Sequence, residues 1–420
     1  MKNILFIILI FILFFNGSCK KEEPITPEIP PVVVTKTNLS VKWYRYFYSD
    51  TTGSYFKNPY FFGNYVAFCS NMTVYGNGQL GIGVFNKLTG EKHIAWNSEP
   101  GNIVLANESI SDWLIGGNNN NYAVFKVSHR ICCFDLNTNI QKWSLLNNDF
   151  LPRINNFGNN VFCCDAFQTH ANLYRINIET GNSVKILTIN KTNGYEPSFE
   201  SYSGWISPIG DTILIFQNRQ WNFSASLGKI DIYAYNLSAD SVLWKLENLT
   251  NDGNSSIRKP IIVGNKLLFQ GMKSVHCINL LTGQIIWEQE YTNEGFAEVD
   301  NLYADGKLFA HSGSQSVMAF DANSGNLLWK TPAVYGIQTG GSMGYYKGKL
   351  YFTGIDHNDQ NVPTHLFCLD ASNGGLLWKG SGFNTGMKDG VIIDQATGYL
   401  YANDSYRVMC IDLNKTPVTK

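Results

Sequence analysis

The sequence predicts an all-β fold, and three features of its 420 residues support that prediction. Aromatic residues make up 14% of the chain, glycine occurs 38 times, and charged residues reach only 15%. Aromatic side chains pack well on pleated strands, and glycine supplies the positive φ angles that many turns require. Because about a quarter of an average globular protein is charged, this composition favours many short, twisted strands over helices.

The overall charge excludes one class of partner. The formal net charge is −1, and the chain contains no long basic run. Binding to nucleic acid normally requires a clustered excess of Lys and Arg. We therefore expect no nucleic-acid partner.

One phrase recurs along the chain, as in MAFDANSGNLLW and HCINLLTGQIIW. The apolar residue before its Asn or Asp marks each copy, and these markers are Phe85, Phe134, Ile176, Tyr235, Ile278, Phe320, Leu369 and Ile411. The intervals between them are 49, 42, 59, 43, 42, 49 and 42 residues. A second hairpin precedes most copies, so each unit has four strands. Four-stranded units at this period predict an eight-bladed β-propeller.

The phrase itself is a β-hairpin. Its turn needs a residue with positive φ, supplied by Gly90, Gly181, Gly283, Gly325 and Gly374, or by Asn139 and Asp240. The strand after the turn ends in a tryptophan: Trp96, Trp143, Trp244, Trp287, Trp329 and Trp378. The third unit has Ser183-Val184-Lys185-Ile186-Leu187 instead. We therefore expect the interface after the third blade to be the least stable.

The two ends of the repeat predict how the ring closes. The last copy stops at Asn414 without its tryptophan strand, whereas residues 41–46, VKWYRY, form an orphan strand containing Trp43. Pairing the two completes the eighth blade and removes the exposed edges of an open sheet. We predict that this N-terminal strand closes the propeller.

The repeat resembles that of the pyrroloquinoline-quinone-type propellers. The shared pattern is a small residue, an apolar residue, Asp, two residues, Ser or Thr, Gly, three residues and Trp, over roughly residues 40 to 415. That family includes quinoprotein alcohol dehydrogenases and the propeller lipoprotein of the outer-membrane β-barrel assembly machinery. The resemblance implies the fold, but the pattern is structural and does not specify a function. A dehydrogenase would need a quinone site, a calcium ligand set and a catalytic Asp, and we match none of these residues here.

The N-terminus predicts export and anchoring. Lys2 precedes an apolar run that ends at Phe15, and residues 16–19, NGSC, resemble a bacterial lipobox. We predict a signal peptide over 1–18, an acylated (palmitate-bearing) Cys19 with a Pro-rich tether over 19–38, and the propeller over 39–420. The alternative is an ordinary signal peptide in which Cys19 is incidental. Anchoring would place the protein at the outer membrane, with the periplasmic and cell-surface sides left open.

The remaining motifs fit structure better than chemistry. Four of the nine cysteines, Cys133, Cys277, Cys368 and Cys410, share a slot that holds Ala319 in another blade, so we expect buried thiols rather than a disulfide framework. The motif at 340–344, GGSMG, has the spacing of a nucleophile elbow, but a hairpin follows it instead of a helix. The seven histidines show no ligand spacing. We predict no metal and no cofactor.

The function we expect is a non-catalytic scaffold that binds another envelope protein. The longest repeat interval holds two insertions rich in aromatic residues, which we predict as a partner surface: Tyr195, Phe199, Tyr202, Trp205, Trp221 and Phe223. The alternative for these residues is an insertion that packs on its own blade. Two other functions stay open, a surface glycan-binding module and a quinoprotein-type dehydrogenase.

Overall fold

A computed structural model describes residues 36–47, 54–73, 81–97, 110–127, 130–138, 140–146, 150–250, 259–271, 273–290, 301–311, 316–332, 341–355, 364–381, 390–404 and 406–415. The chain divides into residues 1–30 and 31–420, and only the second unit contains described residues. The predicted signal peptide, Cys19 and tether residues 20–35 therefore lie outside the described part.

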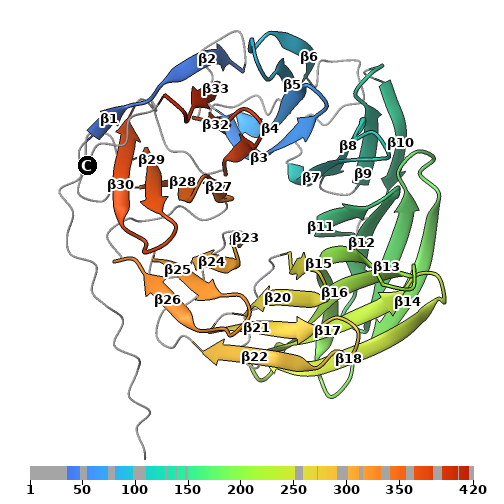
Figure 1. Cartoon of the computed structure of the whole chain (residues 1–420). Helices are drawn as coiled ribbons and strands as arrows, with labels where there is room; N and C mark the ends of the chain where they lie inside the picture. The colour runs from blue at the N-terminus through green and yellow to red at the C-terminus, as the bar shows by residue number, and fades with distance from the viewer. Residues whose placement is uncertain are drawn as a thin grey trace, which may run out of the picture. The chain divides into compact units, whose positions relative to one another are not determined.

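Eight sheets form a ring, and each blade runs from an inner strand to an outer rim strand (Figure 1). Blades 1 to 3 are β3 (Ser54–Phe62), β4 (Tyr65–Thr73), β5 (Gly81–Asn86) and β6 (Lys92–Asn97); β7 (Ile110–Gly116), β8 (Tyr122–Val127), β9 (Arg130–Asp135) and β10 (Ile140–Leu146); and β11 (Phe150–Phe157), β12 (Asn160–Ala166), β13 (His170–Asn177) and β14 (Ser183–Asn190). Blades 4 and 5 are β15 (Glu196–Ile206), β16 (Thr212–Asn222), β17 (Leu227–Asn236) and β18 (Ser241–Thr250); and β19 (Ile261–Val263), β20 (Lys266–Gln270), β21 (Ser274–Asn279) and β22 (Ile285–Glu290). Blades 6 and 7 are β23 (Leu302–Ala304), β24 (Lys307–His311), β25 (Val317–Asp321) and β26 (Leu327–Lys330); and β27 (Gly344–Tyr346), β28 (Lys349–Ile355), β29 (Thr364–Asp370) and β30 (Leu376–Ser381). Blade 8 has β31 (Ile392–Asp394), β32 (Tyr399–Asn403) and β33 (Arg407–Asp412).

The fourth strand of blade 8 is β2 (Val41–Tyr46), from the other end of the chain. It pairs antiparallel with β33, with Trp43 opposite Cys410. The predicted eight-bladed ring and its closure by the N-terminal strand are thus confirmed. One detail differs, because β1 (Lys36–Asn38), which we assigned to the tether, pairs in parallel with β30 as a fifth strand of blade 7.

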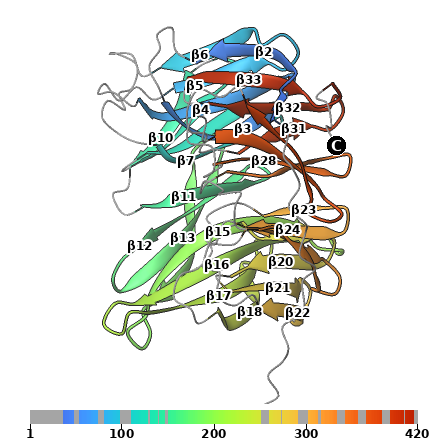
Figure 2. The same ribbon diagram turned by 90° about the vertical axis from the view of Figure 1, so that its left-hand side faces the viewer.

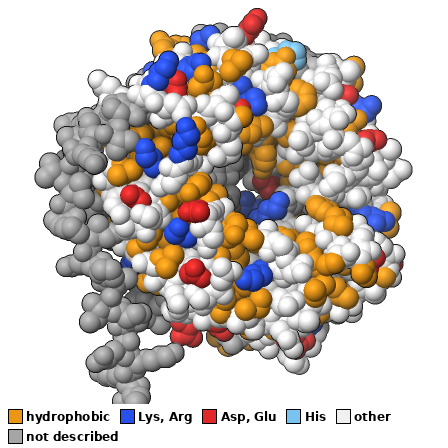
Figure 3. All heavy atoms as spheres, viewed as in Figure 1, with side chains coloured by type: hydrophobic (Ala, Val, Ile, Leu, Met, Phe, Trp, Pro, Cys, Tyr) orange, Lys and Arg blue, Asp and Glu red, His pale blue; other side chains and the backbone are white. Residues whose placement is uncertain are grey.

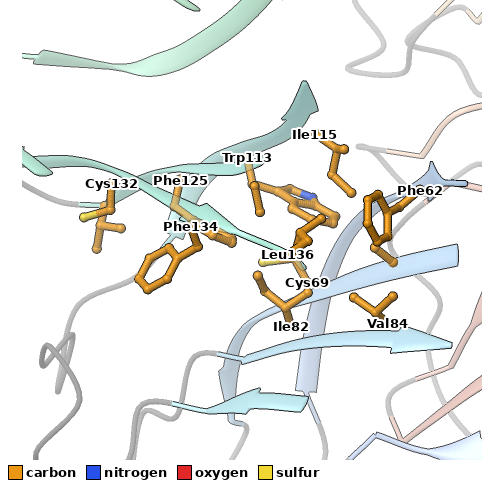
Figure 4. Close-up of a cluster of buried hydrophobic side chains, with 13 residues drawn as sticks. Phe62, Cys69, Ile82, Val84, Trp113, Ile115, Phe125, Cys132, Phe134 and Leu136 are labelled. Carbon is orange, nitrogen blue, oxygen red and sulfur yellow. The ribbon is translucent and has the colours of Figure 1, made fainter. Parts of the chain in front are cut away.

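A hydrophobic cluster fills each of the eight seams between neighbouring blades. Figure 4 shows the seam between blades 1 and 2, where Trp113 of blade 2 faces Phe62 and Ile82 of blade 1. Because no single blade could bury both of its faces, blade-to-blade packing holds the protein together.

Within the described residues, no helix has the length and hydropathy needed to cross a membrane.

In five seams a tryptophan of one blade covers the turn glycine of the next. A Cβ atom at Gly90, whose φ is +67°, would lie 2.4 Å from Cδ2 of Trp43, so the close approach itself demands glycine. The same contact joins Trp143 to Gly181, Trp244 to Gly283, Trp287 to Gly325, and Trp329 to Gly374. Each indole N–H also donates to a backbone carbonyl of the next blade, at 2.7–3.3 Å. The side chain of Trp96 lies outside the described residues.

The strand register within the blade positions the tryptophan for this contact. A β-bulge precedes the tryptophan, as between Gln141 and Trp143, and such a bulge redirects the side chain that follows it. In six blades the residue paired with the tryptophan is small, namely Cys133, Ala234, Cys277, Ala319, Cys368 or Cys410, whereas in blade 1 Trp96 pairs with Ile82. The small-residue slot seen in the sequence is therefore the space beside the indole ring.

All eight cysteines in the described part of the chain are buried free thiols. Neighbouring cysteines point to opposite faces of their strand, so Cys163 belongs to the seam between blades 2 and 3 and Cys164 to the seam between blades 3 and 4. Burial raises the pKa of the Cys133 thiol to about 12, which keeps it protonated and unreactive.

Candidate functional site

Blade 4 differs from the other blades in the length of its strands. β15 and β16 have 11 residues each and β17 and β18 have 10, whereas the strands of blade 5 have three to six. Figure 2 shows these long strands running toward the left-hand side of the view. The sequence insertions therefore lengthen the sheet itself: Trp221 pairs with Glu196 of β15 and with Gly228 of β17, and a bulge between Glu200 and Tyr202 interrupts the β15–β16 register.

Three of the six aromatic residues that we predicted as a partner surface belong to the core. Phe199, Tyr202 and Trp205 lie on β15 with 0%, 1% and 8% of their surface exposed. Phe199 packs against Phe216 with ring centroids 5.2 Å apart, and the Tyr202 hydroxyl donates to the Phe199 carbonyl at 3.0 Å. For these residues the prediction is wrong, because an inserted strand points its side chains into the seams on either side of its blade.

The other three residues gather at the free end of blade 4, which we call the blade 4 tip (Tyr195, Trp221 and Phe223). Phe223 is 68% exposed, and its ring meets Trp221 edge-on with centroids 6.2 Å apart. Lys229 Nζ lies 4.8 Å above the Tyr195 ring, and the Arg219 guanidinium lies 5.9 Å from the Trp221 ring. The tip is thus a small, partly exposed aromatic surface with cations stacked on it.

A buried polar network supports the tip. Asp231 on β17 is 1% exposed and accepts hydrogen bonds from the Gln220 side-chain amide and from the Asn248 backbone N–H. Lys245 Nζ lies 3.4 Å from the Asp231 carboxylate. Because a buried carboxylate is costly unless it is paired and hydrogen-bonded, these contacts fix strands β16, β17 and β18 relative to one another. The tip residues are therefore held on a rigid sheet.

A second candidate is a cavity of about 480 Å³ at the centre of the ring. Its walls come from the inner strands of blades 3 to 7 and the residues just before them, and include Phe157, Ser203, Lys259, Asn301 and Ser342. Figure 3 shows Lys or Arg side chains in this central hollow. Lys259 Nζ lies 3.3 Å from the Asn155 side-chain oxygen, so it reaches across blade 4 to blade 3. No helix follows Ser342, which confirms that its GGSMG motif is not a nucleophile elbow.

One triad of side chains has the composition of a hydrolytic site. Ser274 Oγ lies 2.7 Å from Nε2 of His276, and Glu288 Oε1 lies 3.7 Å from its Nδ1. Burial lowers the pKa of His276 to about 4, which makes the imidazole a poor general base near neutral pH. None of the three residues lines the central cavity. The arrangement therefore serves the packing of blade 5.

Comparison with known proteins agrees with this geometry. Residues 228–414 match the family model described as outer membrane protein assembly factor BamB. BamB from Moraxella catarrhalis superposes with a TM-score of 0.60, at 11% identity, over 89% of this chain and all of that chain. The chain is a pyrroloquinoline-quinone-like β-propeller similar to BamB.

Proteins that are named for other activities also resemble this propeller. A europium-containing methanol dehydrogenase superposes with a TM-score of 0.62 at 10% identity, over 90% of this chain and 96% of that chain. Tetrathionate hydrolase of Acidithiobacillus ferrooxidans is 23% identical over 208 residues, which are 41% of this chain and 39% of that protein. The matched part of this propeller thus spans about two fifths of that relative's length. Identities this low establish the fold alone.

The described residues of this propeller do not fit a quinone and its calcium ion. In the part of the chain that the structure describes, the lining of the central cavity includes no Asp or Glu, although calcium takes most of its ligands from carboxylate and carbonyl oxygens. Among the described residues, no group of three or more His, Cys, Asp or Glu side chains could hold a metal. The adjacent cysteines Cys132 and Cys133 belong to different seams, and both are buried free thiols.

Two features escaped the sequence reasoning. The cavity arises where five inner strands meet, and the repeat phrase lies in the outer half of each blade, so no sequence signal marks the cavity. The strand lengthening in blade 4 had a signal, because residues 212–222 and 227–236 are continuous β-type sequence with a short turn of Phe223 to Ser226 between them.

Proposed function

We propose that this chain is a lipid-anchored outer-membrane protein whose propeller holds a partner protein and catalyses no reaction. The observation that carries the proposal is the blade 4 tip, where Trp221 and Phe223 are presented on a sheet longer than the ring requires. Partly exposed aromatic rings on a rigid support are typical centres of protein interfaces. The similarity to BamB, whose printed description is an outer membrane protein assembly factor, supports a role in outer-membrane protein assembly or in a surface complex.

A pull-down from detergent-solubilised envelopes tests the scaffold. We expect the wild-type protein to recover one defined envelope protein and Trp221→Ser/Phe223→Ser to lose it. Phe167→Ser is the matched control, because Phe167 is an exposed aromatic residue just after β12 of blade 3, where the β12–β13 turn begins. Retention of the same protein by the double variant would contradict the assigned surface.

A glycan-binding module is the second candidate, because Trp221 and Tyr195 could also stack on sugar rings. In that case the same pull-down would recover polysaccharide and no defined protein, again lost in the double variant. A quinoprotein-type dehydrogenase is the third, and the cavity residues argue against it. Purified protein incubated with pyrroloquinoline quinone and a dye acceptor should reduce no dye with alcohols or sugars.

Anchoring has its own test. Labelled palmitate should be incorporated into the wild-type chain and not into Cys19→Ser, and a high-salt wash should release the variant, but not the wild-type chain, from the membrane fraction. Equal membrane retention of both chains would contradict a lipid anchor on Cys19.

A further inference from the structure

The strand that closes the ring also carries an unusual surface. β2 forms the outer rim of blade 8, and Tyr44 and Tyr46 are 50% and 51% exposed there, with ring centroids 6.3 Å apart. Lys42 and Arg45 lie between and beside them on the same strand and are also exposed. We call these four residues the blade 8 rim.

The cations of this rim are not neutralised by carboxylates in the contacts that the structure shows. Lys42 Nζ donates to the Tyr399 hydroxyl at 2.6 Å, and Arg45 donates to the Thr89 carbonyl at 2.9 Å. Arg407, which lies 5.4 Å from the Tyr44 ring, is paired instead with buried Asp404. The rim strand therefore presents two positive charges on its blade 1 side and two amphipathic rings on its other side.

Other outer strands expose a different chemistry. Their large exposed side chains are aliphatic: Ile140 and Leu146 on β10, Val184 on β14, Val242 and Leu243 on β18, Ile285 and Ile286 on β22, and Leu328 on β26. β22 also carries two exposed acids, Glu288 and Glu290. Among the outer strands whose side chains the structure describes, β2 is the one that combines exposed tyrosines with cations.

We propose that the blade 8 rim is a contact surface for an anionic lipid membrane. Tyrosine places an apolar ring and a polar hydroxyl at the level of the lipid headgroups, and Lys and Arg reach anionic phosphates with flexible stems. The proposal rests on the lipid anchor of the proposed function, because the anchor supplies the membrane.

The position of the rim in the chain identifies the membrane as the occupant. Only 16 residues lie between Cys19 and Lys36, where the described chain begins. Such a segment spans at most about 60 Å. β1 then runs along the outer strand of blade 7, so the tether joins the ring beside β2. A short tether raises the effective concentration of the bilayer to roughly millimolar, at which even a weak contact is populated.

The contact would also orient the molecule. Blade 8 and blade 4 are four blades apart in a ring of eight and so lie on opposite sides (Figure 1). A propeller resting on the blade 8 rim stands on its edge and holds the blade 4 tip away from the membrane.

Vesicle binding of the unacylated chain tests the rim directly. The full mature chain with Cys19→Ser should sediment with vesicles of phosphatidylethanolamine and phosphatidylglycerol, and less so in high salt. Both Tyr44→Ser/Tyr46→Ser and Lys42→Glu/Arg45→Glu should lower the affinity for the vesicles at least about tenfold. The first variant removes the rings that enter the headgroup region. The second removes two cations, each of which contributes roughly fivefold near an anionic surface. The matched controls on other rims, Ile285→Ser/Ile286→Ser and Lys142→Glu/Lys185→Glu, should bind as before. Equal binding by rim and control variants would overturn the proposal.

A footprint of the wild-type acylated protein needs no substitution. Acetylation followed by mass spectrometry should show Lys42 protected on vesicles, while Lys142 and Lys185 react as they do in detergent. Labelled palmitate on Cys19 with an unprotected Lys42 would refute the rim contact and leave the lipid anchor standing. A wild-type chain that carries no palmitate but shows Lys42 protected on vesicles would refute the lipid anchor and leave the rim contact standing. Loss of a partner protein from the rim variants, with vesicle binding unchanged, would assign the rim to that protein and overturn the membrane contact.

Discussion

The seam between blades 3 and 4 differs from the tryptophan seams in which of the two blades supplies the aromatic side chain that bonds across it. In a tryptophan seam, such as that between blades 2 and 3, Trp143 reaches forward and its indole donates to the Ile178 carbonyl of the next blade. Between blades 3 and 4 no tryptophan follows the turn: Val184 pairs with Arg175 at the matching register, and Leu187 packs in the seam further along the strand, opposite Leu173. There Tyr235 of blade 4 reaches backward, with its hydroxyl 3.0 Å from the Ile186 carbonyl and 2.6 Å from the Asp240 carboxylate.

The difference shows that each of these seams contains a large aromatic side chain and a hydrogen bond to a backbone carbonyl of the facing blade. Either of the two blades that meet at the seam can provide that side chain. Tyr235 is the one tyrosine among the eight marker residues, and it follows the one blade whose segment lacks tryptophan. Asp240 replaces the turn glycine, with a φ of +52°, because no indole ring needs to approach it. Phe162, Phe199 and Tyr202 complete the seam. The structure thus removes the reason for our expectation that this seam is the least stable.

The largest effect should come from deleting a seam tryptophan. Trp43→Ala leaves a cavity against Gly90 and removes a hydrogen bond, so we expect a loss of about 3–5 kcal/mol in the free energy of unfolding. Leu187→Ala, on the corresponding outer strand of blade 3, should cost about 2 kcal/mol or less, because Leu187 is half-buried. Urea unfolding followed by tryptophan fluorescence measures both. Equal losses would mean that the two kinds of seam contribute alike.

The sequence predicted the ring well because its signals are local. Each turn glycine and each tryptophan can be recognised within a single hairpin, and the hairpins recur at a regular period. The orphan strand around Trp43 matches the one strand that the last blade lacks. The partner surface was harder to predict, because strand alternation decides which aromatic residues face a seam. Phe199 and Phe223 look alike in the sequence, yet one is 0% and the other 68% exposed. The cavity depends on five blades at once and leaves no local pattern.

Acid should weaken a tryptophan seam selectively. His276 faces the seam between blades 4 and 5, and burial lowers its pKa to about 4, below the ordinary 6.5. The unfolded chain therefore binds the proton first, and stability falls as the pH drops from about 6.5 toward 4. Lowering the pH from 7.5 to 5 should cost about 2 kcal/mol through this residue. His276→Gln should flatten that part of the stability–pH curve, as measured by urea unfolding at each pH. An unchanged slope would show that the imidazole binds protons equally well in the folded and unfolded states.

The smallest effect should come from the hydroxyl of Tyr235, and it addresses the seam comparison most directly. Tyr235→Phe keeps the ring in place and removes one donor, so we expect a loss of about 1–2 kcal/mol in the free energy of unfolding. Burial and the hydrogen bond to Asp240 raise the pKa of Tyr235 to about 12, so the effect should not vary between pH 6 and 9. Introducing Leu187→Trp alone should destabilise the protein, because its partner Leu173 is larger than the Cys or Ala that pairs with a native seam tryptophan. Adding Leu173→Cys and Asp240→Gly supplies the small partner and the open turn, and the Tyr235→Phe substitution should then cost less than it does in the wild-type seam. If Tyr235→Phe lowers the free energy of unfolding by the same amount in both backgrounds, the tyrosine does not substitute for the missing indole.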